Sequence, residues 1–198
     1  MYQCISIVGI ETIKMLEGHR NKMWNKNIQI ENKFKFWLLD MKSLSYRIRN
    51  IAKLEIIPIK TRASNIFLHE KKMFGYRKSE HLYLREVLIY ADKLPIMYAR
   101  TILPSKYLRG FWHKIKKLNN KPLANIVFER KMIIRSGFKF KKPSINDTFS
   151  KRIKKFNLKN TKILATRQST FKNKNKNEKV LLTEVFFKNF EQFNYLDG

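Results

Sequence analysis

The sequence predicts a single α+β domain in which an antiparallel sheet is combined with a few helices. Strand-like apolar runs are separated by short polar turns, whereas only two segments place apolar residues at helical spacing. With 198 residues, the chain is long enough to bury a core and an enclosed pocket. We expect a variable lead-in over residues 1–34, the domain over 35–188 and a loose tail over 189–198.

The first half of the domain is predicted to contain a helix, a strand and a hairpin. Apolar residues at helical spacing predict a helix over about residues 35–49. The run KLEIIPIKTR is typical of a strand, and its Pro58 favours an edge position or a bulge. HLYLREVLIY and PIMYARTIL are strand-like runs on either side of ADKL, whose length and Asp92 indicate a hairpin.

The second half is predicted to contain a helix and another hairpin. SKYLRGFWHKIKKLNN has apolar residues at helical intervals, and Pro122 follows its end. ERKMIIRSGFKF fits either a strand or a short helix. The basic tract 139–162 is poorly periodic, so we expect a solvated loop or lid there. ILATRQSTF and KVLLTEVFF flank the polar KNKNKNE, which predicts a second hairpin.

The formal net charge of +28 is the most unusual property of the composition. A surface of this kind attracts polyanions, so a basic nucleic-acid-binding protein is one alternative function. The lysines are dispersed, however, and abundant Lys, Asn and Ile with only 6 Gly and 5 Pro are typical of an AT-rich genome. We therefore expect no specific nucleic-acid partner.

The sequence contains no pattern typical of a metal site, a cofactor site or a membrane span. Cys4 is the single cysteine, which excludes an intrachain disulfide and suits a reducing compartment. The four histidines lack metal-ligand spacing. No apolar run reaches the roughly 18 residues that cross a bilayer, and the first residues do not resemble a signal or transit peptide. We expect no metal, no cofactor and no membrane insertion.

Two strand-like runs carry charged residues although both of their faces are apolar. Glu184 shares a face with Leu182 and Phe186, whereas the neighbours Arg85 and Glu86 point to opposite faces. A buried charge without a partner is costly, or its pKa shifts until the group is neutral. Three explanations remain open: exposure on an edge strand, a structural ion pair, or a pocket in which arginine binds a carboxylate and glutamate binds a proton or hydroxyl.

The segment LYLREVLIYADKLPIMYARTILP resembles the central signature of the bacterial chorismate pyruvate-lyases, which reads Leu-Arg-Glu, Ala-Asp, a turn with Pro, and Arg-Thr-x-x-Pro. FWLLDMKSLSYRI is similar to an early helix of this family, and KPLANIVF and LLTEVFF to later blocks. These four blocks lie in order between residues 36 and 187. Length and composition also resemble plastid-encoded homologues, which predicts the plastid (chloroplast) stroma as the location, with the cytoplasm as the alternative.

The resemblance implies about six antiparallel strands with flanking helices over an enclosed pocket. It also implies a cofactor-independent carbon–oxygen lyase that eliminates pyruvate from chorismate and gives 4-hydroxybenzoate for quinone synthesis. Arg85 would bind the ring carboxylate, Glu184 would contact the ring hydroxyl, and backbone amides near Leu44 and Leu123 would complete the carboxylate site. Glu184 is expected to have a raised pKa and either to act as a base or to orient the hydroxyl. The expected partner is the small-molecule substrate, bound by a monomer.

Three positions depart from the family pattern, of which Leu44, where the family often has methionine, changes little because the backbone amide is used. Ala124 replaces a glycine, and it strains or narrows the pocket if that position has positive φ or lies against the ligand. Lys93 replaces the hairpin glycine, which predicts a different turn type. Glu86 is expected to be structural, Arg100 a second carboxylate contact or part of a surface pair, and Arg167 one of a cluster of arginines. A non-catalytic small-aromatic-acid binding protein of the same fold is the other alternative.

Overall fold

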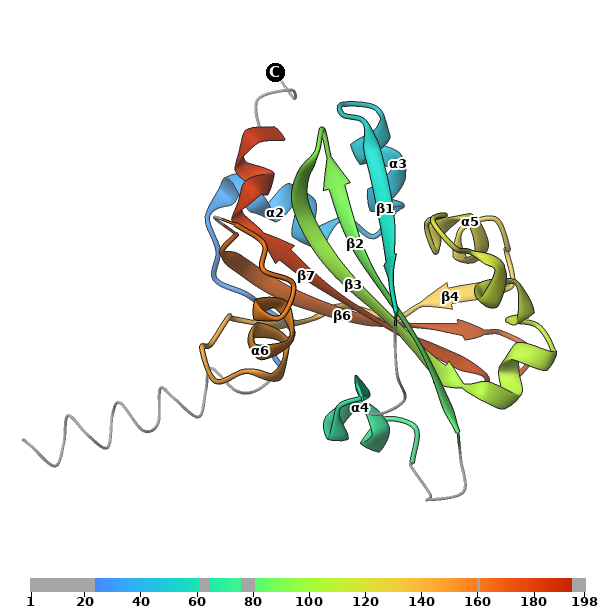
Figure 1. Ribbon diagram of the computed structural model, residues 1–198. Coiled ribbons are helices and arrows are strands. Elements are labelled where there is room, and N and C mark those ends of the chain that lie inside the picture. Colours follow the sequence, from blue (N-terminus) through green and yellow to red (C-terminus); the bar gives the residue numbers. More distant parts are fainter. Residues whose placement is uncertain (1–23, 61–64, 76–80, 160, 194–198) are drawn as a thin grey trace, which may run out of the picture.

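The computed structural model describes residues 24–60, 65–75, 81–159 and 161–193, and shows an α+β domain built on one antiparallel sheet (Figure 1). The sheet has seven strands in the order β1-β2-β3-β7-β6-β4, and β5 also pairs with β6. The fold class is therefore confirmed, with one strand more than expected. The strands are β1 (Leu54–Ile59), β2 (Leu82–Ala91), β3 (Leu94–Pro104), β4 (Ile133–Arg135), β5 (Lys139–Lys141), β6 (Ile163–Asn173) and β7 (Lys179–Phe187).

Short helices cover both faces of the sheet. On one face, α2, α3, η3 and α5 pack against alternate residues of β2, β3 and β7 in the largest core cluster. On the other face lie α4 and α6, which Figure 1 shows on the opposite side of the sheet from α5. In the described part of the chain, no helix has the length and apolarity needed to cross a membrane. The helices are α2 (Asn32–Leu39), α3 (Leu44–Arg49), α4 (Leu68–Lys72), α5 (Ala124–Val127), α6 (Thr148–Lys154) and the 3-10 helices η2 (Ser105–Arg109), η3 (His113–Lys117) and η4 (Lys188–Phe193).

The two predicted hairpins are confirmed, since β2 pairs with β3 and β6 pairs with β7. In the first hairpin, Asp92 and Lys93 have φ angles of 47° and 68°. Positive φ at both central residues is the pattern of a type I′ turn, which Asp-Gly favours. The different turn type expected from Lys93 is therefore not found, and this lysine adopts a left-handed conformation instead. β1 lies at the edge of the sheet, as Pro58 predicts.

Both predicted helices are interrupted. The helix expected over residues 35–49 is two helices, because Asp40 takes an extended conformation and Ser43 caps α3 by accepting a hydrogen bond from the Tyr46 N–H at 3.2 Å. The helix expected after residue 105 is instead the pair η2 and η3, separated at Gly110. Most of the apolar residues that predicted these helices are buried, whereas Met41 is 46% exposed, and local capping and loop geometry divide both segments.

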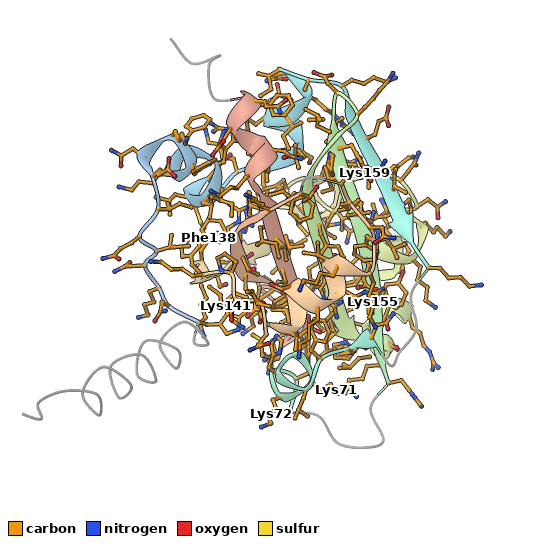
Figure 2. All side chains as sticks on the ribbon, turned by 60° about the vertical axis from the view of Figure 1, so that its left-hand side comes forward. Lys71, Lys72, Phe138, Lys141, Lys155 and Lys159 are labelled. Atoms are coloured by element: carbon orange, nitrogen blue, oxygen red, sulfur yellow. The ribbon has the colours of Figure 1, made fainter. Side chains whose placement is uncertain are left out.

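The basic tract 139–162 is not the solvated loop that we expected. Its first residues form β5, and α6 buries Phe149 and Ile153, which are four residues apart and therefore lie on one face of the helix. In Figure 2, which labels Lys155 and Lys159 of this tract, α6 lies beside α4, and the rings of Phe67 and Phe149 meet edge to face at 5.3 Å. The lysines of α6 occupy its solvent side.

The packed domain extends beyond the expected boundaries at both ends. Asn25 exchanges backbone hydrogen bonds of 2.8 and 2.7 Å with Phe140, and Phe34 of α2 is fully buried. At the other end η4 buries Phe190, whose ring contacts Trp37 at 5.2 Å, so the tail expected to be loose from residue 189 is packed up to residue 193. Residues 1–23 and 194–198 lie outside the described part.

Candidate functional site

Strand register brings residues that are distant in sequence onto one face of the sheet. Arg85 on β2 is opposite Thr101 on β3, which is opposite Leu182 on β7. The next row on the same face contains Ala99 and Glu184, because side chains alternate between faces along each strand. Arg85 and Glu184 therefore face the same side of the sheet from strands that are not neighbours.

A partly open cavity lies over this face, with about 60 Å³ of space that the centre of a water-sized sphere can occupy. It contains both Arg85 and Glu184, and its other charged lining residues are Lys42 and Arg135. Most of the remaining wall is apolar, which is usual for a site that encloses a small organic ligand. The apolar lining includes Ile56, Ile89, Met97, Val127, Phe128 and Phe171.

Arg85 is a buried guanidinium without a carboxylate partner in the described part of the chain. It is 9% exposed, and its Nη2 donates to the carbonyl oxygens of Asn119 at 2.9 Å and Lys121 at 2.8 Å. Burial lowers the pKa of Arg85 to about 10, so the group is still protonated near neutral pH. These two carbonyls fix the side chain and leave its positive charge available to an anion.

Glu184 is buried and ionised. Arg167 Nε donates to its Oε2 at 2.8 Å, and Arg135 Nη2 donates to the same oxygen at 3.2 Å. Burial alone would raise the pKa of Glu184, but the positive charges of Arg167 and Arg135 outweigh that effect and lower it. The expected raised pKa is therefore wrong. In the described part of the chain, Oε1 accepts no hydrogen bond and remains available at the cavity wall.

Arg167 links Glu184 to the helical side of the cavity. It is fully buried, and its Nη1 donates to the carbonyl oxygens of Trp37, Leu38 and Asp40 at the end of α2. The break after α2 therefore has a role, since it leaves these carbonyls free to accept from Arg167.

Arg135 was missed by the sequence analysis. Its Nε donates to Ser169 Oγ at 3.1 Å, and its Nη1 to the carbonyl oxygens of Met41 at 3.3 Å and Lys42 at 3.5 Å. The signal in the sequence was weak: a single arginine at the end of MIIR, in a segment that fits either a strand or a helix. Only the pairing of β4 with β6 shows that this arginine reaches the cavity.

Leu44 and Leu123 both line the cavity. Leu44 is the first residue of α3, and Leu123 immediately precedes α5. The first N–H groups of a helix have no partner within it. In the described part of the chain, neither amide donates to an internal acceptor, so both are available to a ligand. Ala124, the next residue, also lines the cavity and is not among the residues with positive φ, so the expected backbone strain is absent.

The other face of the sheet has a separate buried cluster of charges. Arg100, fully buried, donates from Nε to Glu70 Oε1 at 2.9 Å and from Nη1 to Glu86 Oε1 at 2.6 Å. Glu86 also accepts hydrogen bonds from Tyr98 Oη and from Arg152 Nη2, the latter at 2.7 Å. The two negative charges of Glu70 and Glu86 equal the two positive charges of Arg100 and Arg152, so the cluster has no net charge. Glu86 thus has the structural environment that we expected, whereas Arg100 does not line the cavity and its ion pairs are buried rather than on the surface.

The fold and the cavity define a protein in which helices on one face of an antiparallel sheet cover a partly open, largely apolar cavity. The described residues include no group of three or more His, Cys, Asp or Glu side chains that could hold a metal ion. The chain belongs to the chorismate lyase family, whose sequence model matches residues 19–194.

Curated relatives agree with this placement, and a solved structure shares the fold. Over 153 residues the chain is 28% identical to the probable chorismate pyruvate-lyase of Nitrosospira multiformis, covering 76% of this chain and 83% of the relative. It is 30% identical over 105 residues to the chorismate pyruvate-lyase of Pectobacterium atrosepticum, covering 50% and 56%. The effector domain of PhnF from Mycobacterium smegmatis has a similar structure, with a TM-score of 0.53 and 9% identity over 76% of this chain and 91% of that domain. At this identity, the structural similarity concerns the fold alone.

Proposed function

We propose that the protein is a chorismate pyruvate-lyase, which eliminates pyruvate from chorismate and releases 4-hydroxybenzoate. The observation that carries the proposal is the pair of opposite charges in one cavity: Arg85, which has no carboxylate partner in the described part of the chain, and the ionised Glu184. Membership of the chorismate lyase family supports the same reaction. The AT-rich composition supports a plastid location, and there the product would serve quinone synthesis.

The contacts of Arg85 suggest how the ring carboxylate is held. Because Nη2 is occupied by two carbonyls and every bidentate edge of a guanidinium includes Nη2, the N–H groups of Nη1 or Nε are left for a single charge-assisted bond to a carboxylate oxygen. The free amides of Leu44 and Leu123 would add two neutral donors to the same carboxylate. The ring would then lie over Thr101 and Leu182, which follow Arg85 across the sheet.

The opposite end of the ring would meet Glu184. Its Oε1 would accept a hydrogen bond from the ring hydroxyl, which in chorismate is para to the ring carboxylate. This bond would orient the adjacent C–H and C–O bonds, and a fixed reactive geometry removes much of the entropic part of a barrier.

The reaction needs little more from the protein. The C–H bond at the hydroxyl-bearing ring carbon and the neighbouring C–O bond to the enolpyruvyl group break, and a ring double bond forms. The proton ends on the methylene carbon of the departing group, which becomes pyruvate. Aromatisation provides the driving force. Because its pKa is lowered, Glu184 is a weak base, which favours proton transfer within the substrate over removal by the carboxylate.

The test is a steady-state assay of pyruvate release from chorismate with purified protein, with 4-hydroxybenzoate measured by chromatography. A charge-assisted hydrogen bond contributes about 1.5–3 kcal/mol, so we expect Arg85→Gln to lower kcat/KM by roughly 10- to 100-fold. Arg49→Gln, which removes an exposed arginine of α3, is the matched control and should retain wild-type activity. Full activity of Arg85→Gln would defeat the proposal. Binding of 4-hydroxybenzoate without pyruvate release would instead indicate a non-catalytic acid-binding protein.

A further inference from the structure

The buried charges around the cavity do not balance. Arg135 and Arg167 share the single carboxylate of Glu184, and Arg85 has no carboxylate partner among the described residues. Asp40 is nearby, but it pairs with Arg47 at 3.1 Å. The buried groups at the cavity thus have two positive charges in excess, whereas the cluster around Arg100 on the other face is neutral. Buried uncompensated charge is costly, which makes two anionic groups on the ligand favourable.

Arg135 is the group whose charge is available at the Glu184 end of the cavity. Its hydrogen bonds measure 3.1–3.5 Å, whereas those of the fully buried Arg167 measure 2.8–3.2 Å. Arg135 lines the cavity and Arg167 does not. The rings of Phe138 and Phe171 lie 4.5 and 5.0 Å from the Arg135 guanidinium, so its plane is held in place although its hydrogen bonds are long.

The side chains of Arg85 and Arg135 meet the two ends of one row across the sheet, although Arg135 itself pairs with Phe171 in the strand register. The row runs from Arg85 through Thr101 and Leu182 to Ser169 on β6, and Arg135 donates its Nε–H to Ser169 Oγ. A ligand that lies along this row can therefore present one carboxylate to each arginine.

We infer that Arg135 forms a second carboxylate subsite, which takes the carboxylate of the enolpyruvyl side chain. This assignment rests on the proposed function. In chorismate the enolpyruvyl ether is attached beside the hydroxyl-bearing carbon, at the end of the ring away from the ring carboxylate. A substrate with its ring carboxylate on Arg85 and its hydroxyl on Glu184 therefore carries its second carboxylate toward Arg135. The two excess positive charges match the two negative charges of the substrate, while 4-hydroxybenzoate neutralises only one.

Binding of two non-reacting ligands can test the Arg135 subsite independently of the Arg85 subsite. We would measure by titration calorimetry the Kd of 3-(1-carboxyvinyloxy)benzoate, an aromatic dianion with both carboxylates, and of 4-hydroxybenzoate, a monoanion. For Arg135→Gln we expect the dianion to bind roughly 10- to 100-fold more weakly, since charge-assisted bonds are lost, and the monoanion to change by less than about 3-fold. Arg135→Lys should recover part of the loss. Arg130→Gln is the matched control, because Arg130 also lies over an aromatic ring and donates to a carbonyl but does not line the cavity.

The outcomes distinguish this subsite from the proposed reaction. Equal effects of Arg135→Gln on both ligands, or no effect on the dianion, would overturn the subsite. A wild-type protein that prefers the dianion through Arg135 but releases no pyruvate would retain the subsite and refute the lyase reaction. If the wild-type protein binds neither ligand, both are wrong.

Discussion

Arg167 lies directly opposite Glu184 in the β6–β7 pair and donates its Nε–H to Glu184 Oε2 at 2.8 Å. This bond joins two fully interior groups and determines the state of the carboxylate. Without Arg167 and Arg135, burial would favour a neutral glutamic acid. With them, Glu184 is an anion that accepts hydrogen bonds, which suits a residue that orients a hydroxyl group.

Replacement of Glu184 by glutamine should cost stability as well as activity. The variant leaves two buried guanidiniums without a counter-charge, and breaking a buried ion pair costs about 3–5 kcal/mol. We therefore expect the free energy of unfolding in urea to fall by roughly 3 kcal/mol, together with a lower kcat. Glu191→Gln removes only an exposed pair with Lys33 and should change stability by less than about 0.5 kcal/mol. Similar losses in the two variants would contradict this account.

Stability should decrease as the pH falls below neutrality because of His69. Its ring lies among those of Trp24, Phe67 and Phe149, and burial, reinforced by the charge of Lys141, lowers its pKa from 6.5 to about 4. Between these values the unfolded chain binds the proton and the folded chain does not. The stability that depends on a neutral His69 is therefore fully present above pH 6.5, and this contribution is lost progressively down to about pH 4.

Melting temperatures at about pH 7.5 and about pH 5 would test the effect of His69. We expect the melting temperature to fall less between these two pH values in His69→Gln than in the wild-type protein, because glutamine does not titrate. A decrease of the same size in both would show that other groups cause the pH dependence.

The substitution Ala124→Gly should enlarge the cavity at a small cost in stability. Ala124 begins α5 with an ordinary backbone conformation, so glycine relieves no strain and weakens the helix by up to about 1 kcal/mol. Removal of the methyl group from the wall should improve the binding of 4-hydroxybenzoates with a bulky substituent on the ring, relative to 4-hydroxybenzoate itself. Unchanged relative affinities in calorimetry would show that residue 124 does not limit the space available to the ligand.

Lys93→Gly should stabilise the β2–β3 hairpin. A lysine with φ of 68° is strained, since left-handed conformations cost L-residues other than glycine about 1–2 kcal/mol. Part of this gain is offset by the flexibility of glycine in the unfolded chain, which leaves an expected increase in unfolding free energy of about 0.5–1 kcal/mol. Asn157→Gly is the control, because asparagine tolerates its φ of 49° better than lysine would. A gain at Asn157 equal to that at Lys93 would contradict the explanation.

The faces of the long strands could be predicted from the sequence, because alternation along a strand is local information. Arg85 and Glu184 could thus be assigned to interior positions, and the resemblance to a family brought them to the same site. The pKa of Glu184 could not be predicted in this way. It depends on Arg135 and Arg167, which come from other strands and reach the carboxylate only through the pairing of β4, β6 and β7.

Short elements were the least predictable part of the fold. α6 has only 7 residues, so its two buried apolar positions give too little periodicity to stand out from a basic background. The division between α2 and α3 depends on one serine cap. The missed arginine at position 135 belongs to a strand of 3 residues, which is too short to show alternation.

Arg85 and Glu86 are adjacent, yet one faces the ligand cavity and the other the balanced cluster with Arg100. Sliding β2 by one position against β3 would exchange them, placing an acid at the cavity position of Arg85 and an unneutralised cation beneath α6. The length of the Asp92–Lys93 connection should therefore tolerate no single-residue insertion or deletion. The residue types of this loop are therefore less constrained than its span.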